Sequence, residues 1–396
     1  MSIQPAPRTH RRQAQAHIIQ PESNTPLTPK PAQIVVVGVG GAGNNAINRM
    51  IATQLRGVRF LALNTDAQAL ALSQAPEQMC LGEALTEGLG AGGNPVIGAQ
   101  AAEASRNELK EALKEADLIF LTAGMGGGTG SGACPVVAGI AQELGALVVG
   151  IVTLPFSFEG SRRRKIAQEG IAALSEAVDA LIMVPNDRLL QVVDRDRTLA
   201  DAFQLADDIL RQGVQGMAEV ITVPGLVNVD FADVRAVMQQ AGLALMSIGE
   251  GRGEYRAEEA ASMAVAGGWL GASIQGAQRV LLNITGGDDL TLYEVTQIAS
   301  QVREAVDEHA DLIFGAVLDP QMDDQVRVTL VAAGMARSVD EWGLQQKTPE
   351  TRISHQPGDQ VGVIGSARKR PGTKPALSAV EGKTPAPQEN LHVSAS

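Results

Sequence analysis

Aromatic residues are scarce in this sequence of 396 residues: two tryptophans, two tyrosines and seven phenylalanines make up 3% of the chain. Proteins that bind single-stranded nucleic acid without sequence preference stack the bases on aromatic side chains. A formal net charge of −12 also repels a phosphate backbone. Both features argue against general nucleic-acid binding, so any nucleotide recognised here is expected to be a small ligand.

Cysteine and long apolar runs are scarce as well. Cys80 and Cys134 lie far apart without a further ligand at metal-binding spacing, which argues against a zinc site or a disulfide framework and suits a reducing compartment. We interpret Cys134 as a packed helix residue. No run approaches the roughly 20 apolar residues that cross a bilayer, and the start, MSIQPAPRTHRRQ, lacks the apolar core of a signal peptide. We therefore expect a cytoplasmic protein.

The chain divides by composition. Residues 1–32 are rich in Pro, Gln, Thr and basic residues, and residues 337–396 are rich in Pro, Gly, Ser, Thr and Ala. Neither segment shows hydrophobic periodicity, which predicts a disordered N-terminal extension and a disordered C-terminal linker and tail. Between them we predict an α/β nucleotide-binding domain over 33–198, a long central helix over 199–223 and a smaller mixed α+β domain over 224–336.

Short apolar runs alternate with longer amphipathic ones in both domains. In the first domain this pattern predicts strands at 34–39, 58–64, 117–123, 146–154 and 180–185, and helices near 43–53, 96–115, 130–144 and 160–178. Such alternation is typical of a parallel sheet covered on both faces. In the second domain it predicts helices at 230–240, 255–266 and 291–307 and strands at 243–251, 277–286, 310–319 and 325–333, the last two strands forming a hairpin.

Two glycine-rich segments each follow a predicted strand and precede a helix. GVGGAG fits the pattern G-x-G-x-x-G at Gly38, Gly40 and Gly43, and Asp66 follows at about the distance at which dinucleotide-binding folds keep a ribose carboxylate. Taken alone, this segment favours the NAD site of an oxidoreductase, and a tight strand-to-helix turn is the alternative. The second segment, TAGMGGGTGSG at 122–132, places six glycines among eleven residues. Two such loops favour a longer phosphate chain, because a Rossmann domain needs only one.

A phosphate is the natural partner of these loops. Helix N-termini offer unpaired N–H groups and the positive end of a dipole, and glycine lets an anion approach them closely. The hydroxyls of Thr129 and Ser131 are expected to donate to phosphate, to help hold magnesium, or to cap the helix. Since the loop contains no lysine and no G-x-x-x-x-G-K-[ST] pattern occurs, charge neutralisation falls to the backbone, magnesium and the arginines that follow.

Several segments resemble, in order, the motifs of the FtsZ family, the bacterial, tubulin-like cell-division GTPases. They are IVVVGVGGAGNNAINRM, LALNTDAQAL, GLGAGGNP, GGGTGSG, PFSFEGSRRRK, PNDRLL, DAFQLADDIL and PGLVNVDFADVR, and they cover about residues 33–336. Several long motifs in register are far more specific than one glycine pattern. The resemblance implies a tubulin/FtsZ-like fold and a GTPase that polymerises head to tail into filaments of a division ring at midcell.

The resemblance also implies site residues, position by position. GTP would be bound by the first glycine loop and the residues after it, at Gly40, Gly41, Gly43, Asn44 and Asn45. The segment GGGTGSG, 126–132, which we call the signature loop, would bind the phosphates through Gly127, Gly128, Thr129, Gly130 and Ser131. Gly93 would lie near the γ-phosphate. Glu159 and Arg163 would lie near the ribose and phosphates. Asn186, Phe203 and Asp207 would recognise base and sugar, with Phe203 against the guanine ring and Asp207 accepting from its N1 and N2 donors. Magnesium would bind through the phosphates.

The residues themselves leave simpler interpretations open at some of these positions. Arg162, Arg163, Arg164 and Lys165 also suit a solvated helix face, and Phe203 also suits a core. Asp230 and Asp233, in NVDFAD, also suit a helix cap and a first-turn acid. The resemblance implies instead that both acids enter the nucleotide site of the next subunit and orient the attacking water, with Asn228 supporting them.

The sequence departs from the family pattern in three places. Ser131 replaces a threonine but keeps its hydroxyl, so phosphate binding is expected to survive. Gly93 replaces an alanine, and Val96 and Ala99 replace charged residues, so γ-phosphate sensing or hydrolysis is expected to differ. A structural paralogue that polymerises but hydrolyses weakly is therefore an alternative.

The third departure is the end of the chain. It reads ENLHVSAS instead of the family's acidic, Leu-Arg-containing peptide. The resemblance therefore implies division-ring proteins as partners but leaves open which protein tethers the chain. We interpret ARKRPGTK, 367–374, as a solvated linker.

Overall fold

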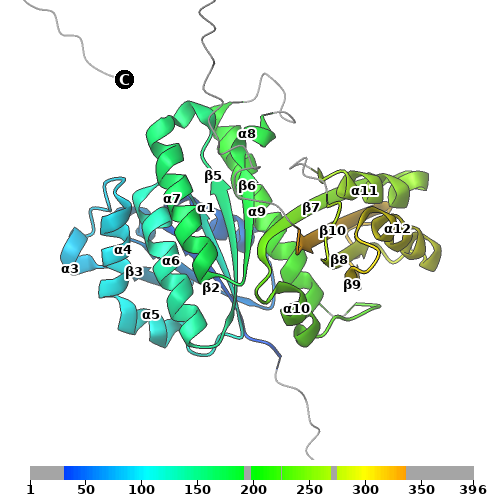
Figure 1. Cartoon of the computed structure of the whole chain (residues 1–396), viewed down its shortest axis with the longest axis horizontal. Helices are drawn as coiled ribbons and strands as arrows, with labels where there is room; N and C mark the ends of the chain where they lie inside the picture. Colours follow the sequence, from blue (N-terminus) through cyan, green and yellow to red (C-terminus); the bar gives the residue numbers. More distant parts are fainter. Residues whose placement is uncertain (1–30, 191–197, 224, 269–273, 336–396) are drawn as a thin grey trace, which may run out of the picture. The chain divides into compact units, whose positions relative to one another are not determined.

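The computed structural model describes residues 31–190, 198–223, 225–268 and 274–335 (Figure 1). The predictions for residues 1–30, for ARKRPGTK and for the rest of the chain beyond residue 335 lie outside these ranges. Within them, ten strands join in one sheet, in the order β3-β2-β1-β4-β5-β6-β7-β10-β8-β9.

The first part of the sheet is parallel. Its strands are β1 (Ile34–Val39), β2 (Val58–Asn64), β3 (Glu77–Cys80), β4 (Leu118–Gly124), β5 (Leu147–Leu154) and β6 (Ala180–Pro185). Every residue of β1 and β5 is buried, as expected for central strands covered on both faces. Because the strands run in parallel, all their carboxyl ends meet at one edge of the sheet.

Helices cover both faces of this parallel part. One face packs against α4 (Pro95–Ala104), α5 (Arg106–Leu113), α6 (Gly128–Glu143) and α7 (Ser161–Ala177). The other packs against α1 (Gly40–Ala52), α2 (Ala67–Ala71), α9 (Leu199–Thr222) and α10 (Phe231–Met238). Figure 1 shows α6 and α7 side by side. Two single turns, α3 (Glu83–Thr86) and α8 (Asn186–Leu189), lie in the loops.

The second part of the sheet is mixed. β7 (Gly242–Arg252) runs parallel to β6, whereas β10 (Gln325–Ala333) is antiparallel to both β7 and β8 (Arg279–Gly286). The helices α11 (Arg256–Val265) and α12 (Leu292–Ala305) pack against this part and against each other.

The hairpin predicted for the last two strands is wrong. β9 (Asp311–Leu318) pairs with β8 in parallel, and β10 lies on the other side of β8, next to β7. Burial explains the order: β10 is buried along most of its length and suits a central place, whereas β9 begins with exposed residues and suits an edge.

The long helix α9 connects the two parts. It begins with a capping box, in which the Thr198 hydroxyl accepts from the Asp201 N–H at 3.2 Å and the Asp201 carboxylate accepts from the Thr198 N–H at 2.9 Å. Its buried face shares a core with β5 and β6 and with Leu281 and Val331 of the second part. The predicted class, a parallel part and a smaller mixed part on either side of a long helix, is confirmed; the domain boundaries stay predictions.

The short helices α2, α3 and α8 were not predicted, and two further features differ from the prediction. The single helix expected at 96–115 is divided into α4 and α5 at Ser105, whose buried hydroxyl accepts from the Gly82 N–H at 2.9 Å. β3 is only four residues long and lacks the apolar run that marks the other strands. No helix within the described ranges is both long and apolar enough to cross a membrane.

Glycines let α4 and α6 pack backbone to backbone. A Cβ at Gly132 would lie 2.0 Å from the Pro95 carbonyl oxygen, and one at Gly98 would lie 2.3 Å from the Gly128 oxygen. Both contacts are far too close for any side chain. The last glycine of the signature loop therefore serves the fold.

We predict that Gly132→Ala lowers the free energy of unfolding by at least about 1–3 kcal/mol, because it overpacks this crossing. Gly139→Ala is the matched control, since Gly139 lies in the same helix with no atom within 4 Å of its missing Cβ. Alanine there is expected to stabilise by about 0.5–1 kcal/mol. Urea unfolding of both variants measures the difference, and equal stabilities would contradict the packing role.

Candidate functional site

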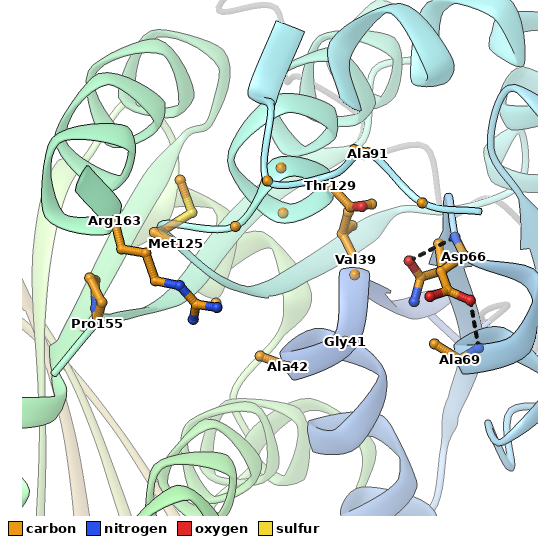
Figure 2. Close-up of a pocket in the computed structure, with 18 of the residues that line it drawn as sticks. Val39, Gly41, Ala42, Asp66, Ala69, Ala91, Met125, Thr129, Pro155 and Arg163 are labelled. Carbon is orange, nitrogen blue, oxygen red and sulfur yellow. Dashed lines mark hydrogen bonds between the residues drawn. The ribbon is translucent and has the colours of Figure 1, made fainter. Parts of the chain in front are cut away.

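A cavity of about 520 Å³ opens at the carboxyl edge of the parallel strands. Ligands of open α/β sheets bind at this edge. Its lining comes from the ends of β1, β2, β4 and β5, from both glycine loops, from the loop at 89–93 and from α8 and α9. In Figure 2, Arg163 and Pro155 lie on one side and Asp66 and Ala69 on the other, with Thr129 and the first turn of α1 between them.

Two helices begin at the cavity without a side-chain cap. α1 starts at Gly40 after Val39, and α6 starts at Gly128 after Gly127; neither preceding residue makes a side-chain capping bond. The first residues of both helices line the cavity. Both helices therefore present unpaired N–H groups and a positive dipole end to the same space, which is an arrangement suited to an anion.

At two positions of this lining, neither the backbone conformation nor the packing requires glycine. Gly41 and Gly127 have ordinary φ values, and a Cβ on either would meet no atom within 4 Å. Alanine would therefore fit the protein at both places. Since both glycines face the cavity, their missing side chains are best explained by a ligand that approaches the main chain closely.

The remaining glycines of the signature loop have structural reasons. A Cβ at Gly128 would lie 2.8 Å from the Asn94 nitrogen, and one at Gly130 would lie 2.6 Å from the Gly124 oxygen. Gly126 has a φ of +103°, which side chains rarely adopt. Gly128 and Gly130 nevertheless line the cavity, so their main-chain groups remain available to a ligand.

Four of the expected nucleotide-binding residues do not line the cavity. Gly43 packs against β4, where a Cβ would lie 2.4 Å from the Thr122 oxygen. Asn44 is buried, and its amide is assigned with the nitrogen toward the loop, because only in this orientation does the nitrogen donate to the carbonyl oxygens of Gly38 at 2.9 Å and Gly40 at 3.3 Å. Asn45 is exposed outside the cavity. Ser131 is buried, and its hydroxyl accepts from the Gly126 N–H at 2.8 Å. Asn44 and Ser131 thus hold the loops from behind.

Asn186, Phe203 and Asp207 line the end of the cavity formed by α8 and α9. The Asn186 side chain is buried, and its Oδ1 has no hydrogen-bond partner in the described structure. Such an unsatisfied atom is costly unless a ligand completes it. Phe203 is 39% exposed and meets the Phe156 ring edge to face at 5.3 Å, so it is held in place without belonging to the core.

The Asp207 carboxyl lies where the cavity meets α9, and its titration is shifted. Burial raises the pKa of its carboxyl to about 6, while Arg49 favours the charged form and opposes the shift. The Arg49 Nε lies 3.8 Å from Asp207 Oδ2. The carboxylate is therefore ionised at neutral pH but only partly paired, and it remains available as a hydrogen-bond acceptor.

Glu159 and Arg163 pair beside the cavity. Arg163 Nη1 donates to Glu159 Oε2 at 2.6 Å, and Glu159 Oε1 accepts from the Phe156 N–H at 2.8 Å. Because Glu159 is anchored to the backbone, the pair holds the guanidinium near the cavity, as Figure 2 shows for Arg163. The arginine side chain is 59% exposed, so it is also part of a solvated helix face.

The loop at 89–93 closes the other side of the cavity. Gly92 and Gly93 have φ values of +58° and +71°, in the left-handed region that favours glycine. Asp66 also lies here, but its Oδ1 accepts from the Ala69 N–H at 2.9 Å and caps α2. The carboxylate is thus used as a helix cap, which weakens the ribose-binding role considered for it in a dinucleotide site.

Asn228, Asp230 and Asp233 lie at the opposite edge of the sheet. Asn228 and Asp230 line a second hollow together with Ile34 and Val58, the first residues of β1 and β2. Asp230 occupies the N-cap position of α10 but makes no side-chain capping bond, and both acids are exposed. Asn228 Oδ1 accepts from the Gly225 N–H at 2.7 Å and shapes the loop. The structure therefore does not bring these residues to the cavity of their own chain.

Some lining residues were missed by the sequence analysis. Met125, Thr153 and Pro155 line the cavity at the ends of β4 and β5, and the rule that ligands bind at carboxyl ends of parallel strands could have identified them. Within residues 31–190, 198–223, 225–268 and 274–335, no group of three or more His, Cys, Asp or Glu side chains is placed to hold a metal ion.

Comparison with known proteins gives matches over most of the chain. Residues 33–194 match the family model described as Tubulin/FtsZ family, GTPase domain, and residues 242–336 match that described as FtsZ family, C-terminal domain. The chain is similar to a structure described as an empty FtsZ dimer of M. jannaschii, with 46% identity and a TM-score of 0.75 over 78% of this chain and 90% of that chain.

A GTPγS-bound protofilament of CetZ2 from Haloferax volcanii is similar in fold, with 22% identity and a TM-score of 0.68. The match covers 79% of this chain and 96% of that chain.

We predict that Gly127→Ala leaves folding intact but weakens GTP binding by at least about tenfold, or about 1.4 kcal/mol. The new methyl group would occupy space that is open in the protein and needed by the anion. Filter binding or calorimetry measures the affinity, and urea unfolding checks stability. Wild-type affinity in a folded Gly127→Ala protein would show that no ligand approaches this part of the main chain.

Proposed function

The chain belongs to the FtsZ family, and from this premise we propose that it binds GTP in the cavity and hydrolyses it in sites completed between subunits stacked head to tail. The observation that carries the proposal is the separation of the cavity from the acid loop. Val39, at the end of β1, lines the cavity, and Ile34, at its start, lines the hollow beside Asp230.

The length of β1 keeps these two places apart. At roughly 3.3 Å per residue, its five steps span about 17 Å, far beyond the reach of a carboxylate hydrogen bond. The acids of one chain therefore cannot act on the nucleotide of the same chain. They suit a neighbour whose acid loop docks on the cavity edge.

Such a contact joins two different surfaces and need not close on itself. Heterologous contacts of this kind propagate into filaments. A protofilament among the similar structures supports this geometry. Membership of the FtsZ family supports a place in the cell-division ring at midcell, with other ring proteins as partners.

We propose one orientation of GTP in the cavity. Its phosphates are proposed to lie at the unpaired N–H groups of α1 and α6, with Arg163 and the Thr129 hydroxyl as additional donors. The guanine ring then lies at the other end, against Phe203, where Asp207 accepts from N1 and N2 and Asn186 Oδ1 gains a partner. Adenine lacks this pair of donors. Magnesium, bound through phosphate oxygens, would neutralise part of the phosphate charge.

Asp230 and Asp233 are proposed to orient the water that attacks the γ-phosphate of the adjoining subunit. Both are exposed acids at the start of α10, and Asp230 is not used as a cap. Asn228 holds the loop through Gly225. Positioning of the nucleophile and charge stabilisation are the main tasks in phosphoryl transfer. The two carboxylates are proposed to perform the first task and the loop amides the second.

We predict that GTP affinity falls as pH drops through about 6, because protonation of Asp207, with a pKa of about 6, removes an acceptor for guanine. Above pH 7 the Asp207 carboxylate is charged, so its titration no longer changes the GTP affinity. Below its pKa the loss of GTP affinity approaches about tenfold per pH unit. Asp207→Asn is the control, since it lacks this titration while the phosphates of the ligand titrate equally in both proteins. Identical pH profiles for the two proteins would exclude this role of Asp207.

We predict that Asp233→Ala still binds GTP and co-assembles but hydrolyses it at least about tenfold more slowly, because water loses an orienting acid.

For the wild type, the rate of GTP hydrolysis per subunit should rise with protein concentration as filaments form. Phosphate release and sedimentation on the same samples measure both effects. A rate independent of dilution, or full turnover by Asp233→Ala, would argue against a shared site, and slow turnover by assembled wild type would identify the weakly hydrolysing paralogue.

A further inference from the structure

Thr65 lies just behind the phosphate end of the cavity. It follows β2, its side chain is completely buried, and it is not part of the cavity lining. Its hydroxyl oxygen lies 2.6 Å from that of Thr129, which does line the cavity at the second residue of α6. Within the described structure, the Thr65 side chain contacts the cavity lining through the Thr129 hydroxyl.

The main chain of Thr65 holds a second part of the lining. Its carbonyl oxygen accepts from the Gly90 N–H at 3.0 Å and from the Thr86 hydroxyl at 3.3 Å. Gly90 begins the glycine-rich wall at 90–93. One buried residue thus bonds to both the start of α6 and the facing wall.

We propose that Thr65 is a positioning residue: it orients the Thr129 hydroxyl toward the phosphate oxygens and fixes the position of Thr129 relative to the glycine-rich wall at 90–93. The inference rests on the proposed function for the place of the phosphates. When the Thr65 hydroxyl donates to Thr129, the Thr129 proton is left free to point into the cavity. Because the Thr65 side chain is β-branched and enclosed, its rotation is restricted, and Thr129 is oriented before the ligand arrives.

The test is GTP binding to dilute protein, where filaments do not contribute. Thr65→Val keeps the shape and removes the hydroxyl, and it should weaken GTP binding about tenfold, as expected for one lost hydrogen bond in a charge-assisted chain. Thr65→Ser should restore affinity to within about twofold, since the hydroxyl returns. Thr86→Val is the comparison, because it removes a buried hydroxyl that bonds to the Thr65 carbonyl oxygen but not to Thr129; it should lower GTP affinity clearly less than Thr65→Val does.

A double-mutant cycle separates positioning from a purely structural role. In a Thr129→Val background, Thr65→Val should change GTP affinity by less than about twofold, because its target is gone. Wild-type affinity in Thr65→Val, or the same tenfold loss in the Thr129→Val background, would overturn the inference. If Thr65→Val does not fold, Thr65→Cys replaces it, since a thiol has similar size and is a weak donor.

The two proposals fail differently. If Gly127→Ala weakens GTP binding and Thr65→Val does not, only the role of Thr65 is contradicted. If neither substitution has an effect, the assignment of the cavity to GTP is itself contradicted.

Discussion

The separation of two edges of one parallel sheet is the constraint on which the rest of the structure depends. Parallel strands gather their carboxyl ends at one edge, and there α1 and α6 begin without caps. The acid loop before α10 lies beside the amino ends of β1 and β2. A chain built in this way has the proposed nucleotide cavity at one edge and the proposed water-orienting acids at the other, so the proposed reaction requires two chains.

Main-chain groups carry most of the proposed charge recognition, and this explains how a chain of net charge −12 can bind a triphosphate. Uncapped N–H groups are fixed by the fold and need no reorganisation when the anion arrives. Side chains then add direction. Arg163 is held by Glu159, the Thr129 hydroxyl is bonded to Thr65, and Ser131 supports the loop from within the protein.

Residue patterns identified the parts of this structure that depend on local chemistry. Apolar runs and glycine loops predicted the strands β1, β2, β4, β5 and β6, the helices α1 and α6 that follow the glycine loops, and the long helix α9. The order of β8, β9 and β10 could not be predicted, because it depends on which strands bury both faces. Similarly, nothing in GGGTGSG distinguishes Gly127, open to the cavity, from Gly132, closed against Pro95. That difference arises from the crossing of α4 and α6, and the roles of Asn44 and Ser131 arise from their burial.

Mixing two defective proteins tests the shared site most directly. Asp233→Ala retains the cavity but lacks an acid, and Gly127→Ala retains the acids but is expected to bind GTP poorly. If acids act on the neighbouring nucleotide, the mixture should release phosphate well above the sum of the two proteins alone, increasingly so as Gly127→Ala is added. A mixture no faster than that sum, with the two proteins shown to sediment together, would contradict a site completed between subunits.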